Sequence, residues 1–543
     1  MTPTRVKRST ARRIVNAAMN RGIMDFFPAG FTPRPNQTEA LERIEAAFAK
    51  PDIDYVVLEA PTGTGKTHIS VTVASYFGSA YLATLTEQLQ TQYTDLFGQL
   101  GMKALKGRGK FQCSKSGTNC KVGAILNKGR CGEACPYTQA KIAAFKSKLT
   151  VGNYHSLLAN IGQAGQFVEE DELGDEEASP IRPLMVLDEC HTVENFLLST
   201  VGFHVDVNKL HVKAPDLPNE LNDSAPYVEW MKEVIPLVKK RAKDIVDPEE
   251  KEDLRILIGK MAFAVKEAGE NPSEFIPERG EGRDGALRKD WFAWKPLRVA
   301  KYGHWVYGFG EKLLLMSATV LDAGQLVKNI GLDPAKGEFI QMGSVFPKEN
   351  RPIVVFPMDM RKNMREENWP TAAELVNRLL NHHRSEKGLL LCPSNEMLKF
   401  IRGRLERKNS ERLIFAYGDE RRQRYEEHVR GRAPTVLAAS GYWEGADLKD
   451  DAARFSIIPS CPRPMWQGQI KARSQLDPNW YRWLTFTKLI QGYGRIVRSE
   501  NDEGIMYLFD RDFVTEMNAK HSMIPAWVRE AVTVKTGAQT YEG

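Results

Sequence analysis

The sequence predicts an α/β protein with two parallel-sheet domains. Short apolar runs bounded by turn residues alternate with stretches of helical periodicity, in two separate blocks along 543 residues. Runs of this kind, separated by helices, are typical of βα repeats whose strands are buried on both faces. Two long insertions interrupt the first block. A chain of this length is expected to hold several domains, at roughly 150 residues each.

Ten apolar runs are predicted to be strands. In the first block they are 55–61, 80–85, 149–153, 184–189 and 313–319, and in the second 388–393, 413–418, 435–441, 455–460 and 504–510. Each block therefore has enough strands for a sheet of its own. The crossover between the two blocks is expected near 346–368.

Composition excludes several classes of protein. The chain is 42% hydrophobic and 27% charged, with a net charge of +6, as in ordinary soluble proteins. No apolar run is long enough to span a membrane, and no signal-peptide core follows the start. Seven cysteines are too few for a disulfide scaffold, which favours a reducing compartment. We therefore expect a cytoplasmic protein without a membrane partner, in a bacterial or viral-host cytosol, or a nuclear or organellar one in a eukaryote.

Basic charge and cysteine gather in the first insertion. Segment 103–148 has eleven Lys and Arg against one Glu, a net charge of +10, so the rest of the chain carries −4. Four of the seven cysteines lie in this segment, at Cys113, Cys120, Cys131 and Cys135. Clustered cations favour a polyanion site, because they release counterions on binding phosphates. A solvated lysine-rich face is the alternative.

The second insertion, about 203–300, is predicted to be helical. Val228, Met231 and Val234 have helical spacing, as have Leu254, Ile258 and Met261, and the two apolar stripes should pack against each other. Trp291 and Trp294, where the chain leaves this insertion, are expected in the core. The first 24 residues hold six basic side chains and no acidic one, which favours a nucleic-acid-binding arm or a frayed helix over a transit peptide.

A phosphate-binding loop follows the first strand. Segment 58–67 reads LEAPTGTGKT, with Ala60 in place of the usual first glycine of the Walker A pattern. Gly63 and Gly65 let backbone N–H groups close on the β-phosphate, Lys66 spans the β- and γ-phosphate oxygens, and Thr67 binds Mg²⁺. Thr62 and Thr64 complete the loop. The pattern predicts nucleotide binding without specifying an activity.

Two further motifs suit phosphoryl transfer. Segment 185–191 reads MVLDECH, in which a strand delivers Asp188 to hold Mg²⁺ through water and Glu189 to polarise the attacking water. A helix cap is the structural alternative. Segment 491–498 reads QGYGRIVR, whose arginines lie on one helix face and could stabilise the γ-phosphate, unless they belong to a surface helix. The second block has no phosphate loop, which fits one ATP held between two domains.

Together these motifs resemble, in order, the DECH-box iron–sulfur superfamily 2 helicases related to XPD and DinG. The resemblance runs from about Phe31 to Asp512. Its other segments are Arg34–Gln37 (RPNQ), 84–92 (TLTEQLQTQ), Asn153–His155 (NYH), Ser317–Thr319 (SAT), 343–351 (GSVFPKENR) and 441–448 (GYWEGADL).

The resemblance implies two RecA-like motor domains, with an iron–sulfur cluster insert and a helical Arch insert in the first. The expected boundaries are 1–24 for the basic arm, 25–104, 149–202 and 301–343 for motor domain 1, 105–148 for the cluster domain, 203–300 for the Arch-like insert, 344–530 for motor domain 2 and 531–543 for a C-terminal tail.

The resemblance also assigns roles to matched residues. Catalysis is assigned to Lys66, Asp188, Glu189, Gln491, Arg495 and Arg498; ATP and Mg²⁺ binding to Arg34, Gln37, Thr62, Gly63, Thr64, Gly65, Lys66, Thr67, Asp188, Gly445 and Asp447; DNA contact to Thr84, Thr86, Gln92, Asn153, Tyr154 and His155; and coupling to Ser317 and Thr319. Packing beneath the cluster domain is the alternative for Tyr154 and His155.

Position in the family order favours a [4Fe–4S] cluster on the four clustered cysteines. Their spacing, C-x6-C-x10-C-x3-C, does not by itself decide between this cluster and Zn²⁺. Cys190 lies inside the DECH box, whereas Cys392 and Cys461 follow strands and are expected to be buried apolar residues.

The expected function is an ATP-dependent DNA helicase that moves on single-stranded DNA, and the family implies 5′→3′ travel. Its expected partners are single-stranded DNA and duplex junctions, bound by a monomeric motor. A clamp or remodeller that hydrolyses ATP without separating strands is the alternative from another class. A motor that acts on RNA is a second alternative, closer in class to the DNA helicase.

Overall fold

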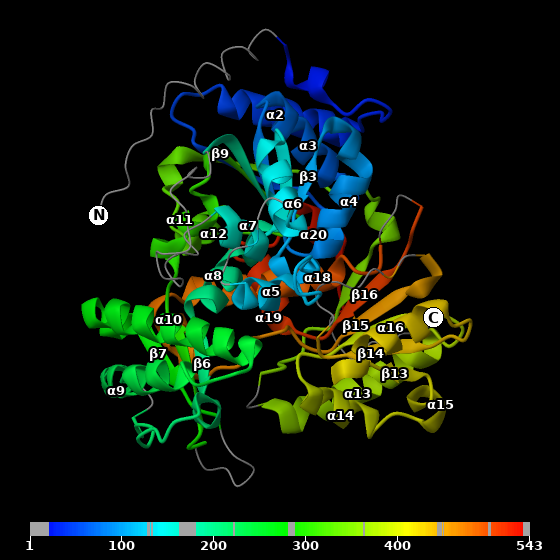
Figure 1. Ribbon diagram of the computed structural model, residues 1–543. Coiled ribbons are helices and arrows are strands. Elements are labelled where there is room, and N and C mark those ends of the chain that lie inside the picture. Colours follow the sequence, from blue (N-terminus) through cyan, green and yellow to red (C-terminus); the bar gives the residue numbers. More distant parts are fainter. Residues whose placement is uncertain are drawn as a thin grey trace.

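The structure is a computed structural model with two seven-stranded sheets, which lie in two neighbouring domains (Figure 1). It describes residues 21–127, 131, 134–161, 181–220, 223–280, 288–361, 364–416, 418–441, 448, 450–497 and 501–535. The two parallel sheets confirm the predicted fold class. Within the described residues, no helix is both long and apolar enough to cross a lipid bilayer.

The first sheet is wholly parallel and has the strand order β10-β1-β9-β5-β2-β4-β3. Its strands are β1 Tyr55–Glu59, β2 Ala80–Thr84, β3 Lys103–Leu105, β4 Leu149–Asn153, β5 Arg182–Asp188, β9 Gly310–Ser317 and β10 Gly337–Gln341. All five runs predicted in this block form strands. Strands β3 and β10 were not predicted from the sequence; they lie at the two edges, where a strand needs less apolar sequence because one side has no neighbour.

The second sheet is also parallel, in the order β13-β14-β12-β15-β16-β11-β17. Its strands are β11 Ile353–Val355, β12 Gly388–Leu391, β13 Leu413–Phe415, β14 Val436–Ala439, β15 Phe455–Ile458, β16 Ile505–Leu508 and β17 Val532–Val534. The five predicted runs are present, and β11 and β17 were not predicted. Because β17 pairs with β11, this sheet extends to Val534, beyond the expected boundary at 530.

Helices cover both faces of each sheet. On the first sheet, α2 (Pro35–Phe48), α3 (Lys66–Tyr76) and α4 (Glu87–Phe97) pack on one face, and α7 (Tyr154–Ile161), α8 (Val193–Val201) and α12 (Ala323–Ile330) on the other. The second domain has α13 (Arg365–His382), α14 (Asn395–Arg402), α15 (Arg407–Ser410), α16 (Arg421–Arg430), α17 (Gly468–Leu476), α18 (Pro478–Tyr493), α19 (Arg511–Met517) and α20 (Ala526–Arg529). Both sheets are therefore buried, as their apolar strands require.

The second insertion is more than the predicted pair of helices. Helices α9 (Ala225–Ala242) and α10 (Pro248–Glu270) bury the two predicted stripes against each other. An antiparallel sheet of β6 (Phe203–Asp206), β8 (Trp291–Pro296) and β7 (Phe275–Glu278) joins them, and the short α11 (His304–Tyr307) follows. Trp294 is fully buried, as expected, and Trp291 is half-buried. Strands of four to six residues give too little alternation to be distinguished by sequence pattern.

The cysteine insertion contains two short helices, α5 (Cys120–Leu126) and α6 (Pro136–Lys146). Helix α5 packs against α10 of the other insertion, and Asn119 Nδ2 donates to Glu249 Oε1 at 3.2 Å. The two insertions, separate in sequence, therefore touch each other beside the first sheet (Figure 1).

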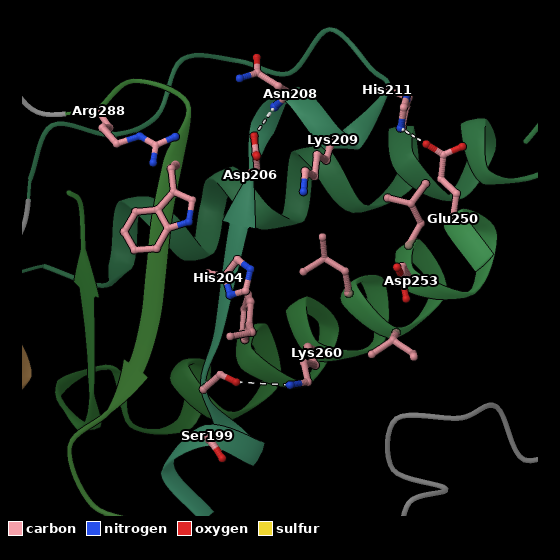
Figure 2. A pocket seen from close by; sticks show the side chains of 16 residues that line it. Ser199, His204, Asp206, Asn208, Lys209, His211, Glu250, Asp253, Lys260 and Arg288 are labelled. Carbon is pink, nitrogen blue, oxygen red and sulfur yellow. Dashed lines mark hydrogen bonds and ion pairs between the residues drawn. The ribbon is translucent and has the colours of Figure 1, made fainter. Parts of the chain in front are cut away.

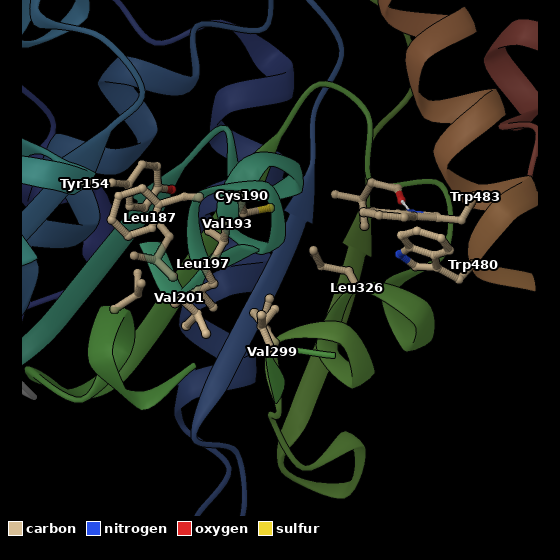
Figure 3. Close-up of a cluster of buried hydrophobic side chains, with 14 of the residues drawn as sticks. Tyr154, Leu187, Cys190, Val193, Leu197, Val201, Val299, Leu326, Trp480 and Trp483 are labelled. Atoms are coloured by element: carbon tan, nitrogen blue, oxygen red, sulfur yellow. Dashed lines mark hydrogen bonds between the residues drawn. The ribbon is translucent and has the colours of Figure 1, made fainter. Parts of the chain in front are cut away.

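One apolar cluster continues from the first domain into the second. It includes Leu187 and Val193 beside the DECH box, Leu326 of α12, and Trp480 and Trp483 of α18 (Figure 3). The two domains consequently share a core along α18.

Candidate ATP site between the two domains

The phosphate loop has the backbone that its glycines predict. Gly63 and Gly65 adopt φ values of +87° and +80°, in the left-handed region that favours glycine. A Cβ atom at Gly65 would lie 2.2 Å from Gln37 Nε2, and one at Gly63 would lie 2.3 Å from Phe346 Cζ. Both positions therefore require glycine for conformation and for space. Lys66 Nζ donates to the Ala60 carbonyl at 3.1 Å.

Both predicted adenine-element residues contact this loop. Arg34 Nη1 donates to the Gly63 carbonyl at 2.6 Å, and Gln37 Nε2 donates to the Gly65 carbonyl at 3.3 Å. The Arg34 backbone N–H donates to Gln37 Oε1 at 2.9 Å, which fixes the glutamine at the start of α2. The structure thus brings Arg34 and Gln37 to the phosphate loop.

Asp188 ends β5 and is buried. Its carboxylate accepts from the Tyr93 hydroxyl at 3.3 Å and from the Glu189 backbone N–H at 3.0 Å. Burial, with the nearby charge of Glu189, raises the pKa of Asp188 to about 7, although Lys66 opposes the shift. Tyr93, which also bonds Ser70 at 2.9 Å, was not predicted, and its place on the buried face of α4 was the available signal.

Glu189 has a different environment. It adopts φ +54°, and its Oε2 accepts from Ser317 Oγ at 3.5 Å. Burial by itself would raise the pKa of Glu189, but Lys66, His191 and Arg495 bring the pKa below its usual value. Glu189 is therefore the ionised member of the pair and can accept a proton from water.

The predicted coupling motif touches the DECH box. Ser317 Oγ lies 2.8 Å from His191 Nδ1, and the Thr319 backbone N–H donates to Ser317 Oγ at 3.0 Å. Both hydroxyl residues are buried.

The second domain contributes the end of α18. Gln491 Nε2 makes a hydrogen bond with His191 Nε2, and Arg495 Nε donates to the Gln491 carbonyl at 3.0 Å. A Cβ at Gly494 would lie 3.4 Å from Thr62 Oγ1, so this segment also approaches the phosphate loop. Residues predicted from both blocks therefore meet in one site. Arg498, Gly445 and Asp447 lie outside the described residues.

The six predicted DNA-contact residues differ in how far their side chains are exposed to solvent. Thr86, Gln92 and His155 are exposed, and Asn153 is half-buried. Thr84 is buried and donates to the Thr86 carbonyl at 3.2 Å. Tyr154 is buried as well, with its hydroxyl donating to the Asp188 carbonyl at 2.8 Å, which favours packing over DNA contact.

The four clustered cysteines influence one another's titration. Burial and the charges of Cys135, Cys131 and Cys113 raise the pKa of Cys120. Hydrogen bonds from Ser116 and the Lys115 backbone lower the pKa of Cys113. No group of three or more His, Cys, Asp or Glu side chains in the described ranges has the geometry of a preformed metal site. Four thiolates are a donor set that iron–sulfur and zinc centres use, and Asn127 Nδ2 donates to Cys113 Sγ at 3.5 Å. The metal centre itself stays a prediction.

Glu59 is a further buried carboxylate, and the sequence analysis did not identify it. It ends β1 and accepts backbone N–H bonds from Val320 at 2.8 Å and Leu321 at 2.5 Å, and a bond from Gln341 at 2.9 Å. Glu59 thereby joins the strand before the phosphate loop to the chain after the SAT motif. A single acid ending an apolar run was its only signal.

A separate cavity of about 940 Å³ opens in the second insertion (Figure 2). Lys209, Lys260 and Asp253 are among its lining side chains, beside a His211–Glu250 ion pair of 2.7 Å. No residue predicted for ATP, DNA or metal binding lines this cavity.

Two family models match the chain in the order of its domains. A type III restriction enzyme res-subunit model matches residues 30–198, and a helicase C-terminal domain model matches residues 377–531. Fold and site together define a two-domain P-loop protein of helicase architecture. More particularly, the chain is similar to XPD- and DinG-like superfamily 2 helicases, in agreement with the resemblance seen in its motifs.

Curated relatives are distant and longer. The chain is 24% identical to the probable ATP-dependent helicase of Methanocaldococcus jannaschii, over 40% of this chain and 37% of that protein. It is 22% identical to the 3′-5′ exonuclease DinG of Bacillus subtilis, over 38% of this chain and 24% of that protein. It is 19% identical to the ATP-dependent DNA helicase YoaA of Haemophilus influenzae, over 40% of this chain and 36% of that protein. The matched segments thus span between about a quarter and a little over a third of these relatives.

Solved structures support the fold over nearly the whole chain. An XPD helicase structure superposes with a TM-score of 0.59 at 14% identity, covering 93% of this chain and 100% of that one. The S. tokodaii Xpd4 structure gives 0.57 at 14% identity, covering 92% and 100%. At this identity the likeness concerns the fold alone.

Proposed function

We propose that this protein is an ATP-dependent DNA helicase that hydrolyses ATP between its two sheets. The observation that carries the proposal is the meeting of the end of α18 with the first domain's motifs, because Gln491 bonds His191 of the DECH box and Gly494 lies beside Thr62 of the phosphate loop. Such two-sided positioning suits phosphoryl transfer, which depends more on placement and charge than on covalent chemistry by the protein.

Each side chain then has a part in hydrolysis. Lys66 and the loop N–H groups bind the phosphates, Asp188 holds Mg²⁺ through water, and Glu189 accepts the proton of the attacking water. Arg495, with Arg498, neutralises charge that develops on the γ-phosphate. Because Ser317 contacts both Glu189 and His191, a change at the phosphates can pass to the segment after β9.

The nucleic-acid partner is proposed to be single-stranded DNA, followed in the 5′→3′ direction. The exposed side chains of Thr86, Gln92 and His155 would contact the strand, and the cysteine and Arch-like insertions would split the duplex. Cys113, Cys120, Cys131 and Cys135 would hold a [4Fe–4S] cluster, or Zn²⁺ as the lesser alternative, whose contribution would be to stiffen a small domain with little apolar core. Single-stranded DNA and duplex junctions are the proposed partners of a monomeric, cytoplasmic motor.

ATP turnover tests the site. Lys66→Ala should reduce DNA-stimulated phosphate release at least about a hundredfold, because the β- and γ-phosphates lose their main cation, while DNA binding persists. Phosphate release with and without single-stranded DNA, and a DNA-binding titration, are the measurements. Turnover that survives Lys66→Ala would remove the site assignment. Stimulation by RNA but not DNA would favour the RNA-directed motor.

A further inference from the structure

A buried ion pair joins the two domains at the end of α18 opposite Gln491. Arg473 of α17 contacts Glu194 of α8, and their side chains are 4% and 1% exposed. Arg473 also donates to the Leu297 carbonyl at 2.9 Å and to Asn329 Oδ1 at 3.1 Å. Its guanidinium lies over the Trp480 ring, 4.2 Å from the centroid. Arg473 of the second domain is therefore enclosed by hydrogen-bond acceptors that belong to the first domain and its second insertion.

Helix α18 contacts the first domain at both ends. Near its start, Trp480 Nε1 donates to Glu194 Oε2 at 3.0 Å and Trp483 Nε1 to the Val320 carbonyl at 2.8 Å, beside Leu326 (Figure 3). Near its end, Gln491 contacts His191. Trp480 and Gln491 are eleven positions apart, or roughly 17 Å along a helix. The helix therefore spans from the Glu194 contact to the ATP site.

The residues that the start of α18 contacts lie on the segments that follow the DECH box and the SAT motif. Glu194 lies six positions after Asp188, and Asn329 lies on α12, which follows the SAT motif. Asp477, just before α18, accepts from Gln325 at 3.1 Å and pairs with Lys328 at 2.6 Å. Replacing either Arg473 or Glu194 would leave the other charge buried without its partner, which is far more costly than losing one partner of a surface pair.

We propose that Glu194 and Arg473 are positioning residues, which hold the start of α18 on the first domain so that Gln491 and Arg495 reach the ATP site. The Glu194–Arg473 ion pair is the fixed point about which the second domain rotates. The rotation then moves the distant end of α18 relative to His191 and Glu189. This inference rests on the proposed ATP hydrolysis and deepens it.

The test compares steady-state ATP hydrolysis by Arg473→Ala, Arg473→Lys and Glu194→Gln with the wild type, with single-stranded DNA present. Arg482→Ala is the matched control, because Arg482 lies on the same helix but pairs with Glu516 inside the second domain. In the alanine and glutamine variants, kcat should fall at least about tenfold while KM for ATP stays within about threefold, since the phosphate loop is intact. Arg473→Lys should recover part of kcat, and Arg482→Ala should match the wild type.

Unfolding by calorimetry separates this inference from the function it rests on. Removing the interdomain pair should divide one coupled transition into two in Arg473→Ala, but not in Arg482→Ala. A wild-type kcat in folded Arg473→Ala would overturn the inference, as would an equal loss in Arg482→Ala. If even the wild type lacked ATPase activity, the proposed function would fail. In that case an undivided unfolding transition in Arg473→Ala would also overturn the docking of α18. A divided transition would support the docking.

Discussion

Asp188 and Glu189 are neighbours in the chain with opposite shifts in pKa, and the difference comes from their surroundings. Asp188 faces Tyr93 and the core, whereas Glu189, at φ +54°, turns toward Lys66, His191 and Arg495. The sequence predicted both acids because they follow an apolar strand. It could not predict Tyr93 or Glu59, because their partners come from distant segments.

The buried side chain of His428 provides a test of how stability depends on pH. Burial lowers the pKa of His428 to about 4, and Lys387 adds to this effect. The Ala452 carbonyl can only accept, at 2.8 Å, so Nε2 carries the proton and Nδ1 accepts from Thr435 at 2.9 Å. The folded state therefore needs the neutral ring.

The direction of the change in stability with pH follows from the difference in the pKa of His428 between the folded and unfolded states. Above an ordinary histidine pKa of about 6.5, folded and unfolded states are both neutral and no stability is lost. As the pH falls from about 6.5 to about 4, only the unfolded state takes up the proton, so the second domain should lose up to about 3 kcal/mol. Urea unfolding of the wild type and His428→Asn at about pH 7 and about pH 5 measures this. An equally steep loss in His428→Asn would contradict it, and His304→Asn, at an exposed ring, is the control.

At the scale of elements, the strands with long apolar runs were predictable, whereas β3, β10, β11 and β17 were not. All ten predicted runs became strands, because burial on both faces leaves a continuous apolar signature. The short strands β6, β7 and β8 have no such signature, and the second insertion was accordingly expected to be helical. Gly445, Asp447 and Arg498 stay predictions, since they fall outside the described residues.

Arg182 at the start of β5 ties the end of the cysteine insertion to the first sheet. Its guanidinium donates to the carbonyls of Ala80 at 2.7 Å, Lys148 at 3.0 Å and Ser147 at 2.8 Å, and it is almost fully buried. Arg182→Met should destabilise the protein by about 3 kcal/mol or more, because buried carbonyls lose their donor. Thermal unfolding measures this, and Arg407→Ala, at a largely exposed side chain, should leave the midpoint near the wild-type value.

The cysteine insertion gives a second prediction at this scale. Cys113→Ser should lose its metal and duplex separation but keep ATP turnover, because the ATP-site residues lie on other elements. Iron, sulfide and zinc content measured beside phosphate release decides this, with Cys392→Ala, at a buried core thiol, as the control that keeps its metal. Bound zinc without sulfide in the wild type would replace the cluster by a zinc site, and a wild-type metal content in Cys113→Ser would contradict the ligand set.

At the scale of the whole molecule, the arrangement explains why one phosphate loop serves two domains. The motif order predicted that a single ATP would lie between the blocks, and Gln491 of the second domain does contact His191 of the first. The docking of α18 through Arg473 could not be predicted, because it depends on how the domains pack. In the proposed function, strand separation would follow from turning the second domain while DNA is held across both.

Displacement of a labelled strand from two matched duplexes tests this account most directly. One duplex carries a 5′ single-stranded tail and the other a 3′ tail, with Lys66→Ala beside the wild type. The account predicts ATP-dependent displacement from the 5′-tailed duplex only, and none by Lys66→Ala. Displacement from the 3′ tail alone would contradict the proposed direction, and no displacement from either, with DNA-stimulated ATPase intact, would contradict the helicase and favour the clamp.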